Sequence, residues 1–403
     1  MQLGLRVVSR ALKTGFGKDV RMVAMLLGGV VALEAGAQPY AFISAPEGSA
    51  VHVVNLADFS LEQSITGLGD EPSDMVLSPD RTRLFLSSWR LQSGGSQIGL
   101  IYAIDTRSRL VVAERELGEN QARAIALSPD GSVVYAWALS GAEERALVRL
   151  DAQDLTVVDS TALPLPDCRN TLYNSMRVHS DGRVFLLGCA SGVKWFDPAT
   201  TLLEDVPGDV WGSELLGFSP DGSELYLADL RTPDNAAQSR LTSLDIATGQ
   251  DQRFAYAMPL GDPYPQMASY PRRLLWVQRP ADPLSEPTPV VLFGPGGALG
   301  FAQVFGLASW GELQQAPALG NRRILASEVV GDSAGYSQGP MAATDDGSRL
   351  IVTGGSGTRL FDSQTLAPMG NVLNLPGLGN GALVDVEIAP FPPQRIFLNG
   401  FES

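Results

Sequence analysis

Short apolar runs alternate along the chain with polar turns, and one such arrangement recurs with a period of about 50 residues. YAFISA (40–45) and VHVVNL (51–56) are followed by a third run and then by a run that ends in LSPD (77–80). The cycle starts again at LFLSSW (84–89). Each run has the length and composition of a β-strand that is largely buried on both faces. The pattern therefore predicts four strands in each repeat.

Three sets of landmarks define the repeat. First strands begin at residues 40, 84, 134, 184, 225, 274 and 350. Second strands end at Asn55, Asp105, Asp151, Asp197, Asp245, Gly294 and Asp362. The run before each restart ends in LSPD (77–80), LSPDG (127–131), HSDG (179–182), FSPDG (218–222), the degenerate ASYPRR (268–273) or TDDG (344–347). Because the three sets stay in phase, they predict an all-β, seven-bladed β-propeller of four-stranded blades.

The recurring acids have a structural explanation. The Ser-Pro-Asp-Gly segments join two apolar strands, where Asp and Gly adopt the conformations of tight turns. The Asp at the end of each second strand leads into polar segments such as DTRS (105–108) and DIATG (245–249), where its carboxylate can accept hydrogen bonds from its own backbone. Acids that recur once per blade are spread around the ring, so we interpret them as turn residues and not as catalytic groups.

The two ends of the repeat region predict how the ring closes. The repeats begin at residue 40 without a preceding inner strand, and ALVDVEIAP (382–390) reads as an inner strand without outer partners. Pairing these segments in one blade would remove the exposed sheet edges. Residues 38–391 are thus predicted to form a single propeller domain. The oversized sixth unit is interpreted as carrying an insertion within about 295–338, with a degenerate eighth blade as the alternative.

Residues 1–37 have the pattern of a secretion signal peptide. Five basic residues are followed by an apolar stretch at 22–33 and by Ala35-Gly36-Ala37. The apolar stretch is short for a bilayer span, although retention as an uncleaved anchor is the alternative. The expected location is outside the cytoplasm, either periplasmic or extracellular. The tail at 392–403 is interpreted as a sorting or processing tag or as a frayed terminus.

Composition limits the partners. The net charge of −15 becomes more negative when the basic leader is removed, so nucleic acid and anionic membranes are not expected partners. We expect a monomer whose partner is a protein or a small molecule. Cys168 and Cys189, the two cysteines of the chain, are predicted to fall on one face of one blade. An oxidising compartment would favour a disulfide between them, and two free thiols are the alternative.

The landmarks resemble the YVTN-repeat propellers, the YncE-like family of exported bacterial proteins. The closest matches to the family pattern are IVTGG (351–355), AIDT (103–106), LSPDG (127–131) and FSPDG (218–222). The resemblance covers nearly all of residues 40–390 and implies a seven-bladed propeller. It implies no catalytic residues, because the repeat motifs of the family are structural. Related propellers include lactonases, quinone-linked dehydrogenase subunits and scaffolds that bind partners.

A search for chemistry in the sequence finds no catalytic constellation. His52 and His179, the only histidines, belong to different landmarks, so no metal site is predicted. The sequence lacks a haem-attachment motif and a serine-hydrolase elbow. GGSGTR (354–359) is interpreted as a turn between strands. SLDIATGQDQRF (243–254) is similar to a turn of quinone-dependent propellers but occurs once, and no cofactor is predicted.

The remaining candidates are aromatic and arginine side chains in the loops that enter inner strands or join the first two outer strands. These side chains suit a binding surface. The predicted ligand-binding residues are Trp89, Arg90, Arg169, Tyr173, Trp211, Tyr264, Arg279 and Tyr336. Acids expected on the same face, which could bind a cation, are Asp70, Glu71, Asp167, Asp209 and Asp262.

The sequence favours an exported scaffold that binds a protein or small ligand on its loop-rich face. The alternative is a lactonase-like hydrolase that uses an acid, an arginine and a divalent metal in the funnel. That alternative rests on analogy of fold and on the acidic loops. The two hypotheses differ in whether chelation and replacement of the acids abolish an activity.

Overall fold

The computed structural model describes residues 39–118, 120–140, 144–163, 176–187, 192–208, 212–229, 240–254, 269–277, 287–295, 300–307, 324–333, 341–344, 346–354, 357–365, 367–378 and 385–390. All of these ranges belong to one compact unit, Gln38–Pro392. In this part of the chain, no helix is long and apolar enough to cross a membrane.

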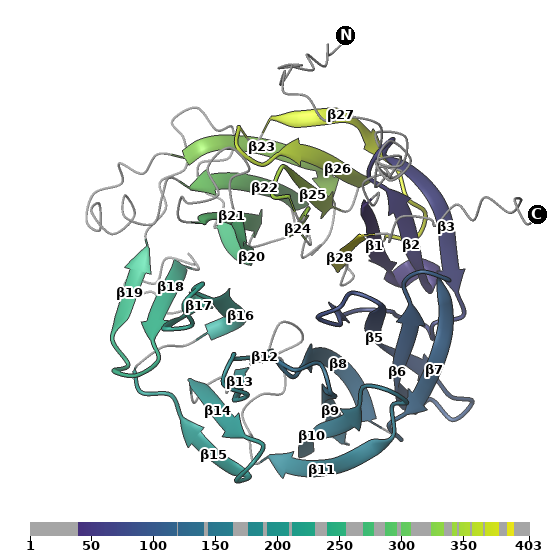
Figure 1. Ribbon diagram of the computed structural model, residues 1–403, viewed down its shortest axis with the longest axis vertical. Coiled ribbons are helices and arrows are strands. Elements are labelled where there is room, and N and C mark those ends of the chain that lie inside the picture. The colour runs from purple at the N-terminus through teal and green to yellow at the C-terminus, as the bar shows by residue number, and fades with distance from the viewer. Residues whose placement is uncertain are drawn as a thin grey trace, which may run out of the picture. The chain divides into compact units, whose positions relative to one another are not determined.

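The described residues form seven four-stranded antiparallel sheets, which we number as blades 1 to 7 with their strands given from the centre outwards (Figure 1). Blade 1 contains β28 (Val386–Pro390), β1 (Pro39–Ala45), β2 (Ala50–Asn55) and β3 (Ser60–Thr66), with the 3-10 helix η1 (Pro46–Gly48) between β1 and β2. Blade 2 contains β4 (Met75–Leu77), β5 (Arg83–Leu91), β6 (Gln97–Asp105) and β7 (Leu110–Glu116). Blade 3 contains β8 (Asn120–Leu127), β9 (Val133–Ser140), β10 (Glu144–Asp151) and β11 (Val157–Leu163).

The remaining blades repeat this order of strands. Blade 4 contains β12 (Met176–Val178), β13 (Val184–Leu187), β14 (Val193–Asp197) and β15 (Leu202–Asp205). Blade 5 contains β16 (Gly212–Phe218), β17 (Glu224–Asp229), β18 (Arg240–Asp245) and β19 (Asp251–Phe254). Blade 6 contains β20 (Ser269–Val277), β21 (Thr288–Pro295), β22 (Gly300–Leu307) and β23 (Ile324–Ser333). Blade 7 contains β24 (Met341–Ala343), β25 (Arg349–Gly354), β26 (Gly357–Asp362) and β27 (Pro368–Leu373).

The inner strands contact one another in a closed cycle. β4 contacts β8, β8 contacts β12, and the series continues through β16, β20 and β24 to β28, which contacts β4. Figure 1 shows the blades arranged around this common centre. The prediction of an all-β propeller of four-stranded blades is confirmed.

The C-terminal strand of the ring completes the first blade. β28 pairs antiparallel with β1, from Pro39 opposite Pro390 to Ile43 opposite Val386. The Ser44 side chain adds to this closure, because its Oγ accepts a hydrogen bond from the Asp385 amide at 2.7 Å. Both long edges of β1 are therefore paired, as the sequence predicted.

The recurring acids hold the turns in which they lie. In the hairpin between β4 and β5, the Asp80 carboxylate accepts hydrogen bonds from the Ser78 hydroxyl at 2.6 Å and from the Thr82 amide at 3.1 Å. The same arrangement recurs around Asp130, where hydrogen bonds from hydroxyl and amide groups of the turn lower the carboxyl pKa to about 2. At the end of a second strand, Asp245 accepts from the Thr248 amide at 2.7 Å. These acids are turn residues, as predicted.

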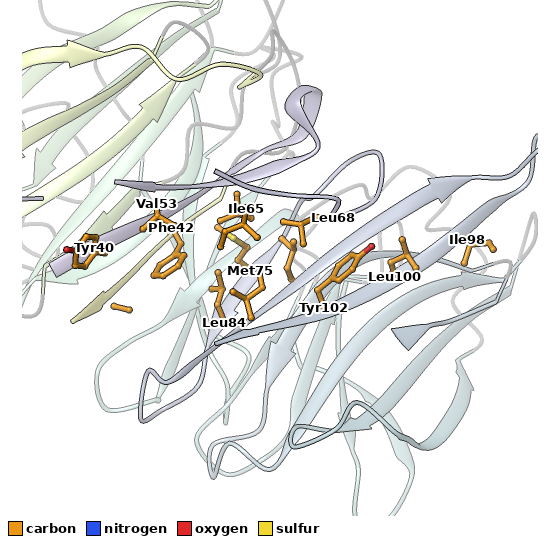
Figure 2. Close-up of a cluster of buried hydrophobic side chains, with 14 residues drawn as sticks. Tyr40, Phe42, Val53, Ile65, Leu68, Met75, Leu84, Ile98, Leu100 and Tyr102 are labelled. Atoms are coloured by element: carbon orange, nitrogen blue, oxygen red, sulfur yellow. The ribbon is translucent and has the colours of Figure 1, made fainter. Parts of the chain in front are cut away.

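Apolar side chains fill the space between neighbouring blades. Figure 2 shows one such cluster, in which Phe42 from blade 1 lies near Met75 and Leu84 from blade 2, while Tyr40 and Tyr102 lie toward opposite ends of the cluster. Burying each of these large side chains stabilises the fold by about 1.5–3 kcal/mol. The strands alternate strictly, so that Leu84 and Leu86 face blade 1 while Phe85 faces blade 3.

The described part of the predicted insertion at about 295–338 contains ordinary blade strands. β22 pairs with β21, and β23 pairs with β22. The segments at 308–323 and 334–340 lie outside the described residues. Within the described ranges, the alternative of an eighth sheet in this region is not observed.

Candidate functional site at the centre of the ring

Two of the eight predicted ligand-binding residues, Trp89 and Arg90, lie in the described part of the chain. The other six lie outside it: Arg169, Tyr173, Trp211, Tyr264, Arg279 and Tyr336. The predicted disulfide pair Cys168 and Cys189, and the acids Asp167, Asp209 and Asp262, also fall outside the described ranges. The leader and the C-terminal tail do as well.

Trp89 is held by the loop that leads into β4. The indole Nε1 donates a hydrogen bond to Glu71 Oε2 at 2.8 Å. The Asp70 amide donates to the Trp89 carbonyl at 2.7 Å, and the Leu91 amide donates to Asp70 Oδ2 at 2.6 Å. Asp70 and Glu71 therefore position Trp89, a role that differs from the predicted cation binding.

Arg90 points away from Trp89. Since side chains alternate along β5, Trp89 leaves the face that carries Phe85 and Arg90 leaves the opposite face. Arg90 is exposed and forms ion pairs with Glu116 and, at 3.9 Å, with Glu114. These two residues of the predicted set therefore face different neighbouring blades.

A group of charged side chains from four blades interacts at the inner strands, and we name it the central charge cluster. Its members are Asp74, Arg177, Arg273, Asp385 and Glu387. Arg273 of β20 lies 3.6 Å from Asp385 Oδ1 and 3.9 Å from Glu387 Oε1. Blade 7 separates blades 6 and 1 in the ring, so Arg273 reaches past a whole blade to bind these acids.

The cluster retains access to solvent. The exposed fractions of the Arg273 and Glu387 side chains are 18% and 24%. Asp74 is also half-buried. The side chains are thus surrounded by strands and yet accessible, which is the situation of groups at a site that receives a small molecule.

Two of the acids also tie neighbouring blades together. Asp385 Oδ2 accepts a hydrogen bond from the Met75 amide at 2.9 Å, and Asp74 Oδ2 accepts one from the Ile125 amide at 2.8 Å. Each bond runs from one blade to a backbone amide of the next inner strand. The Ser87 hydroxyl supports Asp74 by accepting from its amide at 3.1 Å.

The surroundings raise the pKa values of two cluster carboxyls. Burial raises the pKa of Asp74 to about 7, and the nearby Asp385 carboxylate adds to this increase, while Arg177 and Arg273 oppose it. Burial also raises the pKa of Glu387 to about 8, again with a contribution from Asp385 and against the effect of Arg273. Both carboxyls can therefore exchange protons near neutral pH, as catalytic acids and bases do.

The histidines are structural. His52 Nδ1 lies 2.9 Å from the Ser64 hydroxyl and its Nε2 lies 2.7 Å from the Pro376 carbonyl. His179 packs edge-on against Phe218 and shares a hydrogen bond with the Gly222 carbonyl at 2.9 Å. Among the described residues, no group of histidine, cysteine or acidic side chains is arranged to hold a metal ion.

A groove of about 440 Å³ lies on the other face, between the hairpins of blades 2 and 3. Its acids include Asp80 and Asp130, whose carboxylates accept the hydrogen bonds of their own turns. Arg83 crosses the groove to donate a hydrogen bond to the Ala152 carbonyl at 2.8 Å. These contacts give the groove a role in joining two blades.

The sequence interpretation missed the central charge cluster. A signal was available, because Asp74 and Asp385 each precede a proline by the same spacing, in DMVLSP (74–79) and DVEIAP (385–390). This shared spacing places both acids at the start of an inner strand. The positions of Arg273 and Glu387 carry no comparable signal.

Fold and site together define this protein as an all-β propeller with a partly buried cluster of acids and arginines at its centre. A scan against protein-family models found no match, and a search of curated proteins found none. Among solved structures, the chain is similar to the periplasmic gluconolactonase PpgL of Pseudomonas aeruginosa, with 18% identity and a TM-score of 0.57 over 88% of this chain and 100% of that chain. It is also similar to a putative 6-phosphogluconolactonase from Bacteroides uniformis, with 13% identity and a TM-score of 0.53 over 87% and 100%. At these identities the similarity shows a common fold.

Proposed function

We propose that this protein is a hydrolase of lactones, with the central charge cluster as its active site. The observation that carries the proposal is the meeting of the Asp385 and Glu387 carboxyls with Arg273, from blades on different sides of the ring. The raised pKa values of Asp74 and Glu387 give one base and one acid near neutral pH. The names of the two similar structures, a gluconolactonase and a putative 6-phosphogluconolactonase, support this reaction class.

The reaction needs a base, an acid and a positive charge. Asp74 removes a proton from water, whose oxygen adds to the lactone carbonyl carbon and gives a tetrahedral oxyanion. Arg177, whose positive charge lowers the pKa of Asp74, stabilises the oxyanion. The bond between the carbonyl carbon and the ring oxygen then breaks, and Glu387 donates its proton to the leaving oxygen. The product is an open-chain hydroxy acid. Asp74 then releases its proton to solvent and Glu387 takes one back from solvent, which restores both carboxyls.

Gluconolactone hydrolysis by the purified protein, followed at pH 7 with a pH indicator, tests the proposal. Asp74→Asn keeps the shape and an acceptor for the Ile125 amide, and it is expected to lower kcat by about 10²–10⁴. Asp80→Asn, in a hairpin on the other face, is the matched control and should leave kcat unchanged. Equal rates for the wild type and Asp74→Asn would contradict the assignment, and no rate above the uncatalysed reaction would contradict the proposed function.

A second candidate is the partner-binding scaffold that the sequence favours. Trp89 and Arg90 are residue types that often anchor interfaces, and Arg90 is exposed. Capture of a partner by the wild type, but not by a Trp89→Ala, Arg90→Ala variant, would support this function. Lactone hydrolysis by the wild type, with no partner captured by either protein, would favour the hydrolase.

We also propose that the protein is an exported YVTN-repeat propeller. The basic and apolar leader that ends at Ala35-Gly36-Ala37 supports export, and PpgL is described as periplasmic. N-terminal sequencing of the protein recovered from cell fractions tests this. A mature chain that begins at Gln38 outside the cytoplasm is expected, and an intact leader in the cytoplasm would refute export.

A further inference from the structure

The loop at 67–74 is fixed against β5 and cannot shift without losing close contacts. Its Gly69 packs so tightly that a Cβ there would lie 2.5 Å from Ser88 Oγ and 2.7 Å from the Trp89 carbonyl oxygen. The Ser49 hydroxyl donates to the Asp70 carbonyl at 3.2 Å from the neighbouring blade. The segment that carries Glu71 to the indole is therefore rigid.

The hydrogen bond to Glu71 sets the orientation of the indole. Because Nε1–H is the only donor of the ring, its bond to Glu71 Oε2 leaves the two π faces as the surface for other contacts. Trp89 is half-buried. An aromatic ring held in this way offers a flat apolar surface at little cost in conformational entropy.

Trp89 lies beside the central charge cluster. It shares a strand face with Ser87, two residues away, which corresponds to about 7 Å along β5. Ser87 Oγ accepts a hydrogen bond from the Asp74 amide. Glu71 is three residues from Asp74, a distance of at most about 10 Å along the chain. The indole and the proposed base thus belong to one side of one blade.

We propose that Trp89 is a stacking platform for a sugar ring, and that the substrate is an uncharged, polyhydroxylated lactone. This inference rests on the proposed function and names its substrate class. The C–H face of a sugar ring fits a π face, and its hydroxyl groups are donors that match neighbouring carboxylates, which only accept. Beside the indole, a phosphate group would meet the repulsion of Asp70 and Glu71.

Binding of gluconolactam, a ring analogue with an amide in place of the ester, tests the platform without hydrolysis. Titration calorimetry of the wild-type chain should show binding, which Trp89→Ala weakens at least tenfold and Trp89→Phe weakens less than about threefold. Glu71→Gln keeps an acceptor for the indole and should bind like the wild type, while Glu71→Ala should weaken binding. Equal affinities for the wild type and Trp89→Ala, or no lactam binding by the wild type, would overturn the inference.

Kinetics provide the second measurement. Trp89→Ala should raise KM for gluconolactone about tenfold and leave KM for δ-valerolactone, which has no hydroxyl groups, unchanged. A higher kcat/KM for a phosphorylated lactone than for gluconolactone would overturn the substrate class and leave the hydrolase standing. Lactam binding through Trp89 without any lactone hydrolysis would refute the proposed function and leave the platform standing. If Trp89→Ala does not fold, tryptophan fluorescence of the wild type and of Trp89→Phe replaces this measurement. The platform predicts that the lactam changes the emission of the wild type and that Trp89→Phe loses this change. An unchanged signal in Trp89→Phe refutes the platform.

Discussion

Replacing Asp74 with Asn should change how the stability of the propeller depends on pH. In the folded chain burial and Asp385 raise the pKa of Asp74 from 3.8 to about 7. Between these two values the folded state holds a proton that the unfolded state has released. Raising the pH across this window therefore favours the unfolded state.

The magnitude follows from the two pKa values. Well inside the window, each added pH unit lowers the free energy of unfolding by about 1.4 kcal/mol, and the decrease per pH unit becomes smaller near pH 7, where Asp74 titrates in the folded state. Integrating from pH 5 to pH 8 gives a loss of about 2–3 kcal/mol in the free energy of unfolding from this group. Asn is neutral throughout, so the Asp74→Asn variant should gain about this much stability over the wild type between pH 5 and pH 8. Its activity should nevertheless be lost.

Urea unfolding at several pH values between 5 and 8, followed by tryptophan fluorescence, measures the difference. Asp80→Asn is the control. Hydrogen bonds from Ser78 and Thr82 lower the pKa of Asp80 from 3.8, so its contribution to stability is lost only as the pH falls below that value. The stability difference between wild type and Asp80→Asn should therefore stay constant between pH 5 and pH 8. A constant stability difference between wild type and Asp74→Asn across this range would refute the reasoning.

Three further outcomes are expected. The value of kcat/KM for lactone hydrolysis should rise near pH 7 as Asp74 loses its proton and fall near pH 8 as Glu387 loses its own; a flat profile, after subtraction of spontaneous hydrolysis, would refute these roles. In urea unfolding, Gly131→Ala should destabilise the fold by about 2–3 kcal/mol and Gly118→Ala by about 1–2 kcal/mol. Both glycines have positive φ, but only at Gly131 would a Cβ lie 2.7 Å from a proline of the neighbouring hairpin. Equal losses of stability would contradict the packing argument. Deleting 386–390 should cost at least about 3–6 kcal/mol, since this strand carries two buried aliphatic side chains, and unchanged thermal unfolding would refute ring closure as a source of stability.

The sequence predicted the features that recur and missed those that do not. Asp80 and Asp130 occur within local Ser-x-Asp turns, where the partners of each carboxylate are two residues away, so the pattern alone reveals their roles. Closure was also predictable, because the unpaired first and last strands have complementary positions in the repeat.

The central charge cluster could not be read in the same way. Arg273 and Asp385 belong to different blades, and their contact depends on how far a side chain extends past the intervening blade. No local pattern encodes this distance. The sequence reading placed Trp89 and Arg90 together in a loop. Both residues lie within β5, where strand alternation sends their side chains to opposite faces.

The closure of blade 1 has a consequence for biosynthesis. Ser44 and Asp385, which are joined by a hydrogen bond, are 341 positions apart in the chain. At ribosomal speeds this separation corresponds to roughly 20–70 s, during which β1 exists without its inner partner. The last strand to be synthesised is thus the one that lies innermost in the first blade. A nascent chain can build most of its sheets in order, but it presents one open edge to neighbouring chains and to chaperones until its final strand arrives.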